Sequence, residues 1–281
     1  MSKVLVIIKS MGIGDLSILI SSIHAISKKI AKPVTVLAQE NTRASAILKH
    51  DPYIKEVIEL NKNEIKENFH YKFFSKKGKN FFKTAKEFTE KTLNIEINSQ
   101  SKIYWDNNDI EKAKKNYDIT NNTKNIICGI SASGPTKCWD INNYIRLFEE
   151  LNKKYKSKFF LAGGSNDEEL IKKVINSNVG KNCISFSKMK LSEAIPIIGA
   201  SQYYIGNDTG WGHIASALGL KSLFLFMDSP PLAYGVYSKN IEIVCPEGFT
   251  IENTGHNTRG KDRISFDKVL KKSSEMINLN F

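Results

Sequence analysis

The sequence predicts an α/β protein built from doubly wound parallel sheets. The chain opens on a strand, a glycine turn and a helix followed by a second strand, which is a β-α-β unit. After a polar stretch over residues 116–125, five further strand-like segments alternate with helix-like segments. In such a sheet, ligands bind at the carboxyl ends of the strands, so functional residues are expected directly after them.

The first unit is predicted from its apolar pattern. Residues 3–8 form a continuous apolar, β-branched run, which is typical of a buried parallel strand. Apolar residues then recur at helical spacing over 15–30, and Pro33 precedes a second strand over 34–38. The second set of elements follows the same patterns. The expected strands cover 126–130, 159–162, 183–186, 203–206 and 222–226, and the expected helices 141–155, 167–175, 191–198, 211–218 and 265–279, the last capped by Ser265.

Composition is that of an ordinary globular protein, with 41% apolar and 25% charged residues in 281. No apolar run approaches the roughly 20 residues that span a bilayer, and the run ended by Lys9 is too short for a secretory signal. The four cysteines form no C-x-x-C pair. We therefore expect neither a disulfide framework nor a zinc site, and a reducing cytoplasm fits.

Positive charge is in surplus, with 41 Lys and Arg against 29 Asp and Glu and a net charge of +12. The surplus attracts phosphates, anionic membranes or nucleic acid, but lysine used simply for solubility explains it equally well. Residues 61–90 hold eight Lys, four Glu and six Phe. This segment either rests on an anionic membrane or packs its Phe residues on the N-terminal half with its Lys residues in water; the second interpretation is favoured.

Gly12-Ile13-Gly14-Asp15 lies between the first strand and helix. The glycines permit a sharp turn and leave room for a ligand, and Asp15 stands at the carboxyl edge of the sheet. The sequence allows three interpretations of Asp15: a helix cap, a base, or part of a dinucleotide-binding fingerprint in which Glu40 binds a ribose. The spacing G-x-G-x-x-S matches the fingerprint weakly, and a carboxylate repels a pyrophosphate. Proton abstraction is the preferred role.

Two further motifs follow strands. Residues 131–137, S-A-S-G-P-T-K, offer small hydroxyl side chains, a glycine and the Lys137 cation to phosphate oxygens, without the Walker spacing. Residues 206–213, G-N-D-T-G-W-G-H, place a glycine-rich helix start after a strand, where free N–H groups bind anions. The charge of Asp208 opposes a phosphate, so we expect it to turn aside, capping the helix or accepting sugar hydroxyls. His213 is expected to be a buried, satisfied histidine.

Together these motifs resemble glycosyltransferase family 9, the lipopolysaccharide heptosyltransferases. The family's motifs occur in order as Gly14-Asp15, as S-G-P-T-K-C-W over 133–139, as G-G-S-N-D-E over 163–168, and as D-T-G-W-G-H over 208–213. The match is continuous over about 126–226. Its most specific part is D-T-G-x-x-H, followed by the residues up to Gly219.

The resemblance implies a GT-B fold, in which two Rossmann-like doubly wound domains face each other across a cleft. The implied parts are a shortened acceptor domain (1–122), a nucleotide-sugar domain (123–264) and a C-terminal helix (265–281). The implied reaction is inverting, metal-independent transfer of heptose or a related sugar, most often from ADP-heptose, to a hydroxyl of a cell-surface glycan or lipid-linked acceptor. No cofactor is expected. No nucleic-acid partner is expected either, because the sequence shows no RNA- or DNA-binding signature. The expected location is cytoplasmic, with peripheral membrane contact left open.

The resemblance also implies roles for single residues. Asp15 is the base. The expected donor contacts are Ser133, Thr136 and Lys137 with the pyrophosphate, Glu168 with the ribose, Met189 near the nucleobase, and Thr209 and Gly210 with phosphate, completed by Gly14, Asp208 and His213.

The sequence departs from the family's pattern in three places. Ala132 replaces a common second hydroxyl residue, Met227-Asp228-Ser229-Pro230 replaces a glycine-bearing turn, and residues 61–117 lack a recognisable match. The donor site is therefore better supported than the acceptor site. A non-catalytic nucleotide-sugar binder and an NAD-dependent oxidoreductase using Gly12, Gly14 and Glu40 remain alternatives.

Overall fold

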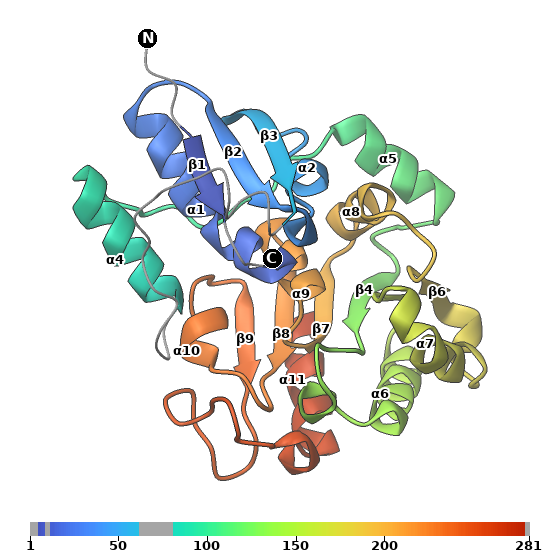
Figure 1. The fold of residues 1–281 in the computed structure, drawn as a ribbon. Coiled ribbons are helices and arrows are strands. Elements are labelled where there is room, and N and C mark those ends of the chain that lie inside the picture. The colour runs from blue at the N-terminus through green and yellow to red at the C-terminus, as the bar shows by residue number, and fades with distance from the viewer. Residues whose placement is uncertain (1–4, 9–11, 62–80, 279–281) are drawn as a thin grey trace.

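The protein, described here by a computed structural model for residues 5–8, 12–61 and 81–278, is built around two parallel sheets (Figure 1). The smaller sheet has the strand order β1-β2-β3 and the larger one the order β6-β5-β4-β7-β8-β9. All recorded strand pairs are parallel. The doubly wound α/β class predicted from the sequence is confirmed.

The smaller sheet contains the predicted β-α-β unit and one strand that was not predicted. Strand β1 (Leu5–Ile8), helix α1 (Ile13–Lys29) and strand β2 (Val34–Gln39) fall close to the expected positions. Strand β3 (Ile54–Leu60) pairs with β2, and the 3-10 turn η1 (Glu40–Thr42) and short helix α2 (Ala44–Ile47) connect the two. The sequence of β3, I-K-E-V-I-E-L, mixes charged and apolar residues because most of the strand is only partly buried. It therefore lacks the apolar run that marks a buried strand.

The larger sheet contains the five predicted strands and adds β9. Its strands are β4 (Lys124–Gly129), β5 (Ser157–Leu161), β6 (Cys183–Ser185), β7 (Tyr203–Asn207), β8 (Lys221–Leu225) and β9 (Ile241–Val244). The strand order reverses between β4 and β7, which are neighbours in the sheet. This reversal is the topological switch point at which open α/β sheets bind ligands.

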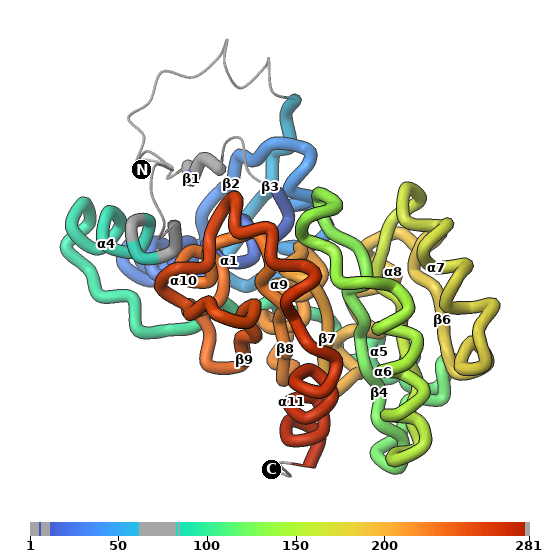
Figure 2. Tube along the Cα trace, turned by 90° about the horizontal axis from the view of Figure 1, so that it is seen from below, coloured from blue at the N-terminus to red at the C-terminus, as the bar shows by residue number. Residues whose placement is uncertain are grey.

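Helices cover both faces of the larger sheet. One face packs against α6 (Ile141–Lys154), α7 (Glu168–Ile175) and α11 (Phe266–Asn278). The other face packs against α8 (Leu191–Ala200) and α9 (Gly210–Ala217). Helices α5 (Asn107–Asn116) and α10 (Pro231–Tyr234) were not predicted, and α9 begins one residue earlier than expected. The tube view shows α6 and α7 on the side of the molecule away from α1 (Figure 2).

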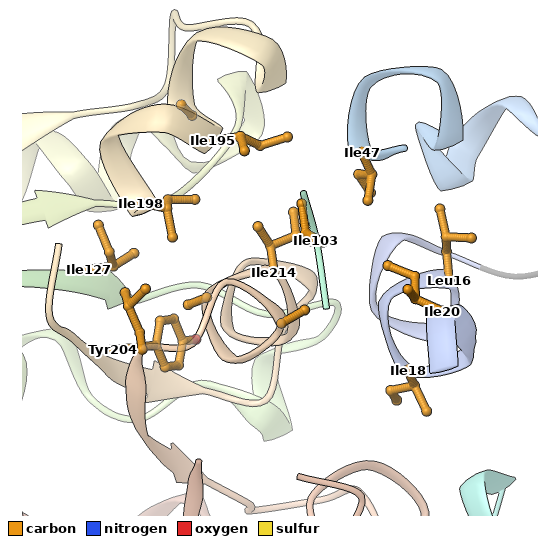
Figure 3. Packing of buried hydrophobic residues seen from close by; sticks show 14 of the residues in the cluster. Leu16, Ile18, Ile20, Ile47, Ile103, Ile127, Ile195, Ile198, Tyr204 and Ile214 are labelled. Atoms are coloured by element: carbon orange, nitrogen blue, oxygen red, sulfur yellow. The ribbon is translucent and has the colours of Figure 1, made fainter. Parts of the chain in front are cut away.

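The two halves share one apolar core. Leu16 and Ile20 of α1 and Ile47 of α2 belong to the same buried cluster as Ile195 of α8 and Ile214 of α9 (Figure 3). Helix α1 packs against α9, and α2 packs against α8. The N-terminal half is therefore seated on the α8–α9 face of the larger sheet through side chains that are almost completely buried.

The segment before β4 also contacts the larger half. Helix α5 packs against α8, and the N–H of Ile103 donates to the carbonyl of Ala217 at 2.9 Å. The division of the chain at residue 122 stays a prediction, because these contacts join the end of the first unit to the second.

The lysine- and phenylalanine-rich segment is only partly within the described residues, which exclude 62–80 and with them Phe69, Phe73 and Phe74. Its last part forms α4 (Phe81–Leu93), which packs against α1 and α10. Ala85 is buried, but Phe88 keeps 41% of its surface exposed. The expectation that the phenylalanines are packed away therefore fails at Phe88. Among the described residues, no helix is both long enough and apolar enough to cross a bilayer.

Candidate active site

A cleft of about 550 Å³ lies where the two halves meet. It collects the start of α1, the loop after β4 and the start of α9, so three segments that are distant in the chain form one site. Its lining residues are Gly12, Ile13, Gly14, Asp15, Asn41, Ser131, Ala132, Ser133, Lys137, Asp167, Asp208, Thr209, Gly210, Trp211, His213, Tyr234 and His256. Of the predicted site residues, Gly14, Asp15, Ser133, Lys137, Asp208, Thr209, Gly210 and His213 are brought together here.

The starts of α1 and α9 touch through two glycines. A β-carbon on Gly210 would lie 3.0 Å from Cβ of Ile13 and 3.4 Å from the backbone nitrogen of Gly14. A side chain at this position would fit only if Ile13 moved by a few tenths of an ångström, so glycine at position 210 helps the two helix ends approach. The G-D and D-T-G motifs therefore face each other across the chain halves.

Asp15 stabilises the start of α1, but it is not itself the N-cap residue: Gly12 is the N-cap, and Asp15 lies three residues after it. Its Oδ2 accepts a hydrogen bond from the N–H of Gly12 at 3.0 Å, which caps the first turn of α1. The same half-buried side chain lines the cleft. Asp15 can therefore stabilise the start of α1 and still be available to a substrate in the cleft.

The loop after β4 is anchored by a buried amide. Asn207, at the end of β7, accepts hydrogen bonds at Oδ1 from the Tyr144 hydroxyl (2.7 Å) and the Trp139 N–H (3.2 Å). Its Nδ2 donates to the carbonyl of Ser131 at 3.3 Å. The amide is completely buried, and these bonds satisfy both of its ends. They tie both ends of the 131–139 loop to the switch point, which places Lys137 over the cleft.

Within this loop, the side chains of Thr136 and Lys137 have different surroundings. The 3-10 turn η2 (Pro135–Lys137) directs Lys137 to the cleft, whereas the Thr136 hydroxyl donates to Oδ2 of Asp228 at 2.7 Å. Thr136 is not among the residues that line the cleft. Its predicted contact with a pyrophosphate stays a prediction.

Asp208 is held by two neighbours. Its Oδ1 lies 3.1 Å from Nε2 of His213, and its Oδ2 accepts the Ser229 hydroxyl at 2.6 Å. Burial favours the neutral acid, but the His213 ring, the Ser229 hydroxyl and the Lys137 cation outweigh it and lower the pKa of Asp208. The expected capping of α9 is absent, since Thr209 is the N-cap residue and no side chain caps it.

His213 is buried and satisfied, as the sequence predicted. Its Nδ1 lies 2.9 Å from the Tyr237 hydroxyl, while Nε2 faces Asp208. Asp208 is occupied by His213 and Ser229, and Thr209 and Gly210 at the start of α9 line the cleft together with Lys137. A helix N-terminus of this kind binds anions through its dipole and its free N–H groups.

Glu168 and Met189 lie outside this cleft. Glu168 lines a second pocket of about 230 Å³ together with Ile171, Lys172, Ile175, Ser185, Ser187 and Lys188. Its carboxylate is 3.7 Å from Lys172 Nζ and 3.9 Å from Lys188 Nζ. Asp167, the preceding residue, lines the main cleft, so the two pockets are neighbours. Met189 packs against the apolar core and lines neither pocket.

The described residues contain no group of three His, Cys, Asp or Glu side chains placed to hold a metal ion. Glu40, which the oxidoreductase alternative requires, begins η1 and does not line the cleft. The cleft instead combines the Asp15 carboxylate with the Lys137 cation and the start of α9.

A family model described as glycosyltransferase family 9 (heptosyltransferase) matches residues 57–259. The chain belongs to this family. The match includes the 61–117 segment, in which the sequence alone gave no recognisable resemblance, and it extends beyond Phe226 to the loop that carries His256.

Relatives agree with this assignment. The chain is 27% identical over 214 residues to lipopolysaccharide heptosyltransferase 1 of Campylobacter coli, a match covering 70% of this chain and 62% of the relative, which is less than two thirds of its length. The crystal structure of the glycosyl transferase family 9 protein from Veillonella parvula has a TM-score of 0.79 at 16% identity, covering 97% of this chain and 96% of that one. E. coli ADP-heptose lps heptosyltransferase II has a TM-score of 0.70 at 15% identity, covering 98% of both chains. These likenesses confirm the GT-B fold.

The structure adds cleft residues of this family 9 protein that sequence reasoning missed: Asn41, Asp167, Trp211, Tyr234 and His256. Asn41 follows the carboxyl end of β2, so its place after a strand was the available signal. Tyr234 and His256 come from α10 and a long loop, where no pattern marks them. Burial, with the negative charges of Asp15 and Asp208, raises the pKa of Tyr234 to about 12, so its hydroxyl keeps its proton at neutral pH.

Proposed function

We propose that the chain is an inverting glycosyltransferase that moves heptose or a related sugar from ADP-heptose to a hydroxyl of a cell-surface glycan or lipid-linked acceptor. Membership of family 9 supports sugar transfer, and the names of two relatives supply the sugar and the nucleotide. The observation that carries the proposal is that Asp15 lines the same cleft as Lys137 and the start of α9.

In the proposed reaction, an acceptor hydroxyl attacks the anomeric carbon of the donor from the side of Asp15. The new carbon–oxygen bond forms as the bond to the diphosphate breaks, which inverts the configuration at that carbon. The hydroxyl proton passes to Asp15. A carboxylate is a weak base for a free alcohol, but the alcohol becomes acidic late in the transition state.

The leaving nucleoside diphosphate gains negative charge as the bond breaks. Lys137 and the N-terminus of α9 line the cleft, and both present positive charge there. The protonated Tyr234 hydroxyl offers a further donor in the same cleft. These groups support a transfer in which the protein's own charges stabilise the leaving group, which is the basis for proposing metal-independent chemistry.

The two ends of the donor fit the two neighbouring pockets. We assign the diphosphate and sugar to the main cleft and the nucleoside to the pocket of Glu168, where the carboxylate would accept ribose hydroxyls. On this assignment residues 123–264 bind the donor and residues 1–122 receive the acceptor. A lipid-linked acceptor would bring the protein into peripheral contact with the inner face of the cytoplasmic membrane.

The deciding experiment is Asp15→Asn. The amide oxygen of Asn still accepts the Gly12 N–H, so the cap is retained while the base is lost. Transfer from ADP-heptose should fall by about 10²–10⁴-fold, the usual contribution of a general base. ADP affinity, measured by calorimetry, should be unchanged.

Glu193→Gln is the matched control. Glu193 also caps a helix start, accepting the Lys190 N–H at 2.8 Å, but it lies outside the cleft. This variant should transfer sugar like the unmodified protein. Normal turnover in Asp15→Asn would remove Asp15 from the mechanism, and ADP binding without transfer to any acceptor in the unmodified protein would favour the non-catalytic binder.

A further inference from the structure

The turn that departs from the family's pattern makes two contacts that reach distant segments. Asp228 lies in this turn, between β8 and α10. Its Oδ2 accepts the Thr136 hydroxyl at 2.7 Å, and its Oδ1 accepts the N–H of Arg259 at 2.9 Å. One carboxylate therefore joins η2 to the long loop that precedes α11.

Each of these segments carries one cleft residue with a basic side chain. Thr136 precedes Lys137 directly, and Arg259 follows His256 by three residues. Both Lys137 and His256 line the cleft, whereas Asp228 does not. The carboxylate can therefore hold the two basic residues in place without presenting its own negative charge to a bound anion.

The loop that carries His256 has a strained backbone. Asn257 and Arg259 have φ values of 72° and 49°, in the left-handed region that residues other than glycine rarely adopt. Hydrogen bonds hold this shape: the Gly255 N–H donates to the Thr258 hydroxyl at 2.9 Å, and the Gly260 N–H donates to the Met227 carbonyl at 2.9 Å. These bonds fix the position of the loop that carries His256.

The charge of Asp228 fits this role. Burial favours its neutral form, but the Arg259 N–H and the Thr136 hydroxyl, together with the nearby Lys137 and His256, lower its pKa. The carboxylate is thus ionised at neutral pH and is a strong acceptor for both hydrogen bonds.

We propose that His256 binds the phosphate nearest the transferred sugar and that Asp228 is a positioning residue for His256 and Lys137. This inference rests on the proposed function. The phosphate is assigned from the direction in which the donor would lie across the two pockets. His256 shares the main cleft with Asp15, at the reacting end, while the pocket of Glu168 is assigned to the nucleoside.

Calorimetric titrations with ADP and with AMP test the first part. His256→Ala should weaken ADP binding roughly tenfold, the loss expected for one hydrogen bond to a charged group. AMP, which lacks the second phosphate, should bind with little change. Lys181→Ala is the control, because it removes an exposed cation of the same half that does not line the cleft, and both affinities should be retained.

A double-variant comparison tests the second part. Asp228→Ala should weaken ADP binding at least as much as His256→Ala, because it releases two segments. In the His256→Ala background its further effect should be smaller, since the residue through which it partly acts is gone. Asp228→Asn should restore most of the affinity, because an amide oxygen still accepts the Arg259 N–H.

Thermal unfolding separates positioning from stability. Asp140→Ala removes another carboxylate that accepts a backbone N–H, at 2.8 Å from Asn142, and it should lower the melting temperature without changing ADP affinity.

If the unmodified protein binds ADP and His256→Ala binds it equally well, this inference is wrong while the proposed function stands. Additive effects of Asp228→Ala and His256→Ala would overturn the positioning role. Failure of the unmodified protein to bind ADP would overturn the proposed donor and this inference with it.

Discussion

Gly14 lies so close to His213 that a β-carbon on the glycine would be 2.7 Å from Cδ2 of the imidazole. The same β-carbon would be 3.6 Å from Cα of Gly210. Gly14 and His213 come from opposite halves of the chain, the first from the G-D motif and the second from the D-T-G-x-x-H motif. Their contact sets how closely the starts of α1 and α9 approach, and with that the width of the cleft.

Gly14→Ala should widen this contact. His213 cannot move aside cheaply, because Asp208 and Tyr237 hold both of its ring nitrogens. Overpacking of this kind costs about 1–3 kcal/mol of unfolding free energy, and ADP binding should weaken as the helix starts separate. Urea denaturation and calorimetry measure the two effects. Gly12→Ala is the control for the unfolding free energy, since no atom of another segment lies within 4 Å of its β-carbon; equal stability of the two variants would contradict the prediction.

Asp208→Asn should destabilise the protein in a pH-dependent way. The pKa of Asp208 is lower in the folded protein than the ordinary value of 3.8, so its ionised form stabilises the fold at every pH above about 4. That stabilisation disappears as the pH falls through the lowered pKa. The unfolding free energies of the two proteins should differ by about 2 kcal/mol at pH 7 and converge in strong acid.

Urea denaturation between pH 7 and strong acid tests whether the stability difference between the two proteins shrinks as the pH falls. Asp267→Asn, which changes an exposed carboxylate in the first turn of α11, should follow the unmodified protein at every pH. A difference for Asp208→Asn that stayed constant down to pH 2 would show that the carboxylate does not stabilise the fold through its charge.

Two side-chain contacts of equal length, one buried and one exposed, should differ in their effect on stability. The His24 Nε2–Asp51 Oδ2 and Lys114 Nζ–Glu111 Oε1 distances are both 2.7 Å. The side chains of the first pair are 4% and 1% exposed, whereas those of the second are 43% and 68% exposed. Asp51→Ala leaves a buried imidazole and the Tyr53 N–H without their acceptor and should cost about 3 kcal/mol in denaturation experiments. Glu111→Ala should have no measurable effect.

The fold of the larger half was predictable mainly because its central strands β4, β5, β7 and β8 are buried on both faces. Ile126, Phe159 and Ile205 pack on one face of the sheet, and Ile127, Phe160 and Tyr204 pack on the other, so the sequence shows continuous apolar runs. Strands β3 and β9 are edge strands of their sheets with mostly half-buried residues, and they lack such runs. Pattern alone could not separate them from loops.

Those residues of the candidate site that lie in turns between a strand and a helix were predictable, because the local sequence marks such turns. Gly14, Asp15 and Gly210 follow strands and begin helices, and their neighbours in the sequence show this. His256 and Tyr234 reach the cleft only through the path of the chain after β8, which no local pattern encodes. For the same reason, the bond from Thr136 to Asp228 could not be foreseen, since it joins residues 92 positions apart.

The shared core of α1, α2, α8 and α9 restricts how a substrate enters. Rotating one half away from the other would bring Leu16, Ile47 and Ile214 into water, at about 25 cal/mol for each Å² of apolar surface uncovered. Opening by a hinge between rigid halves is therefore costly. Admission and release of molecules should depend instead on smaller movements of segments that do not belong to this core.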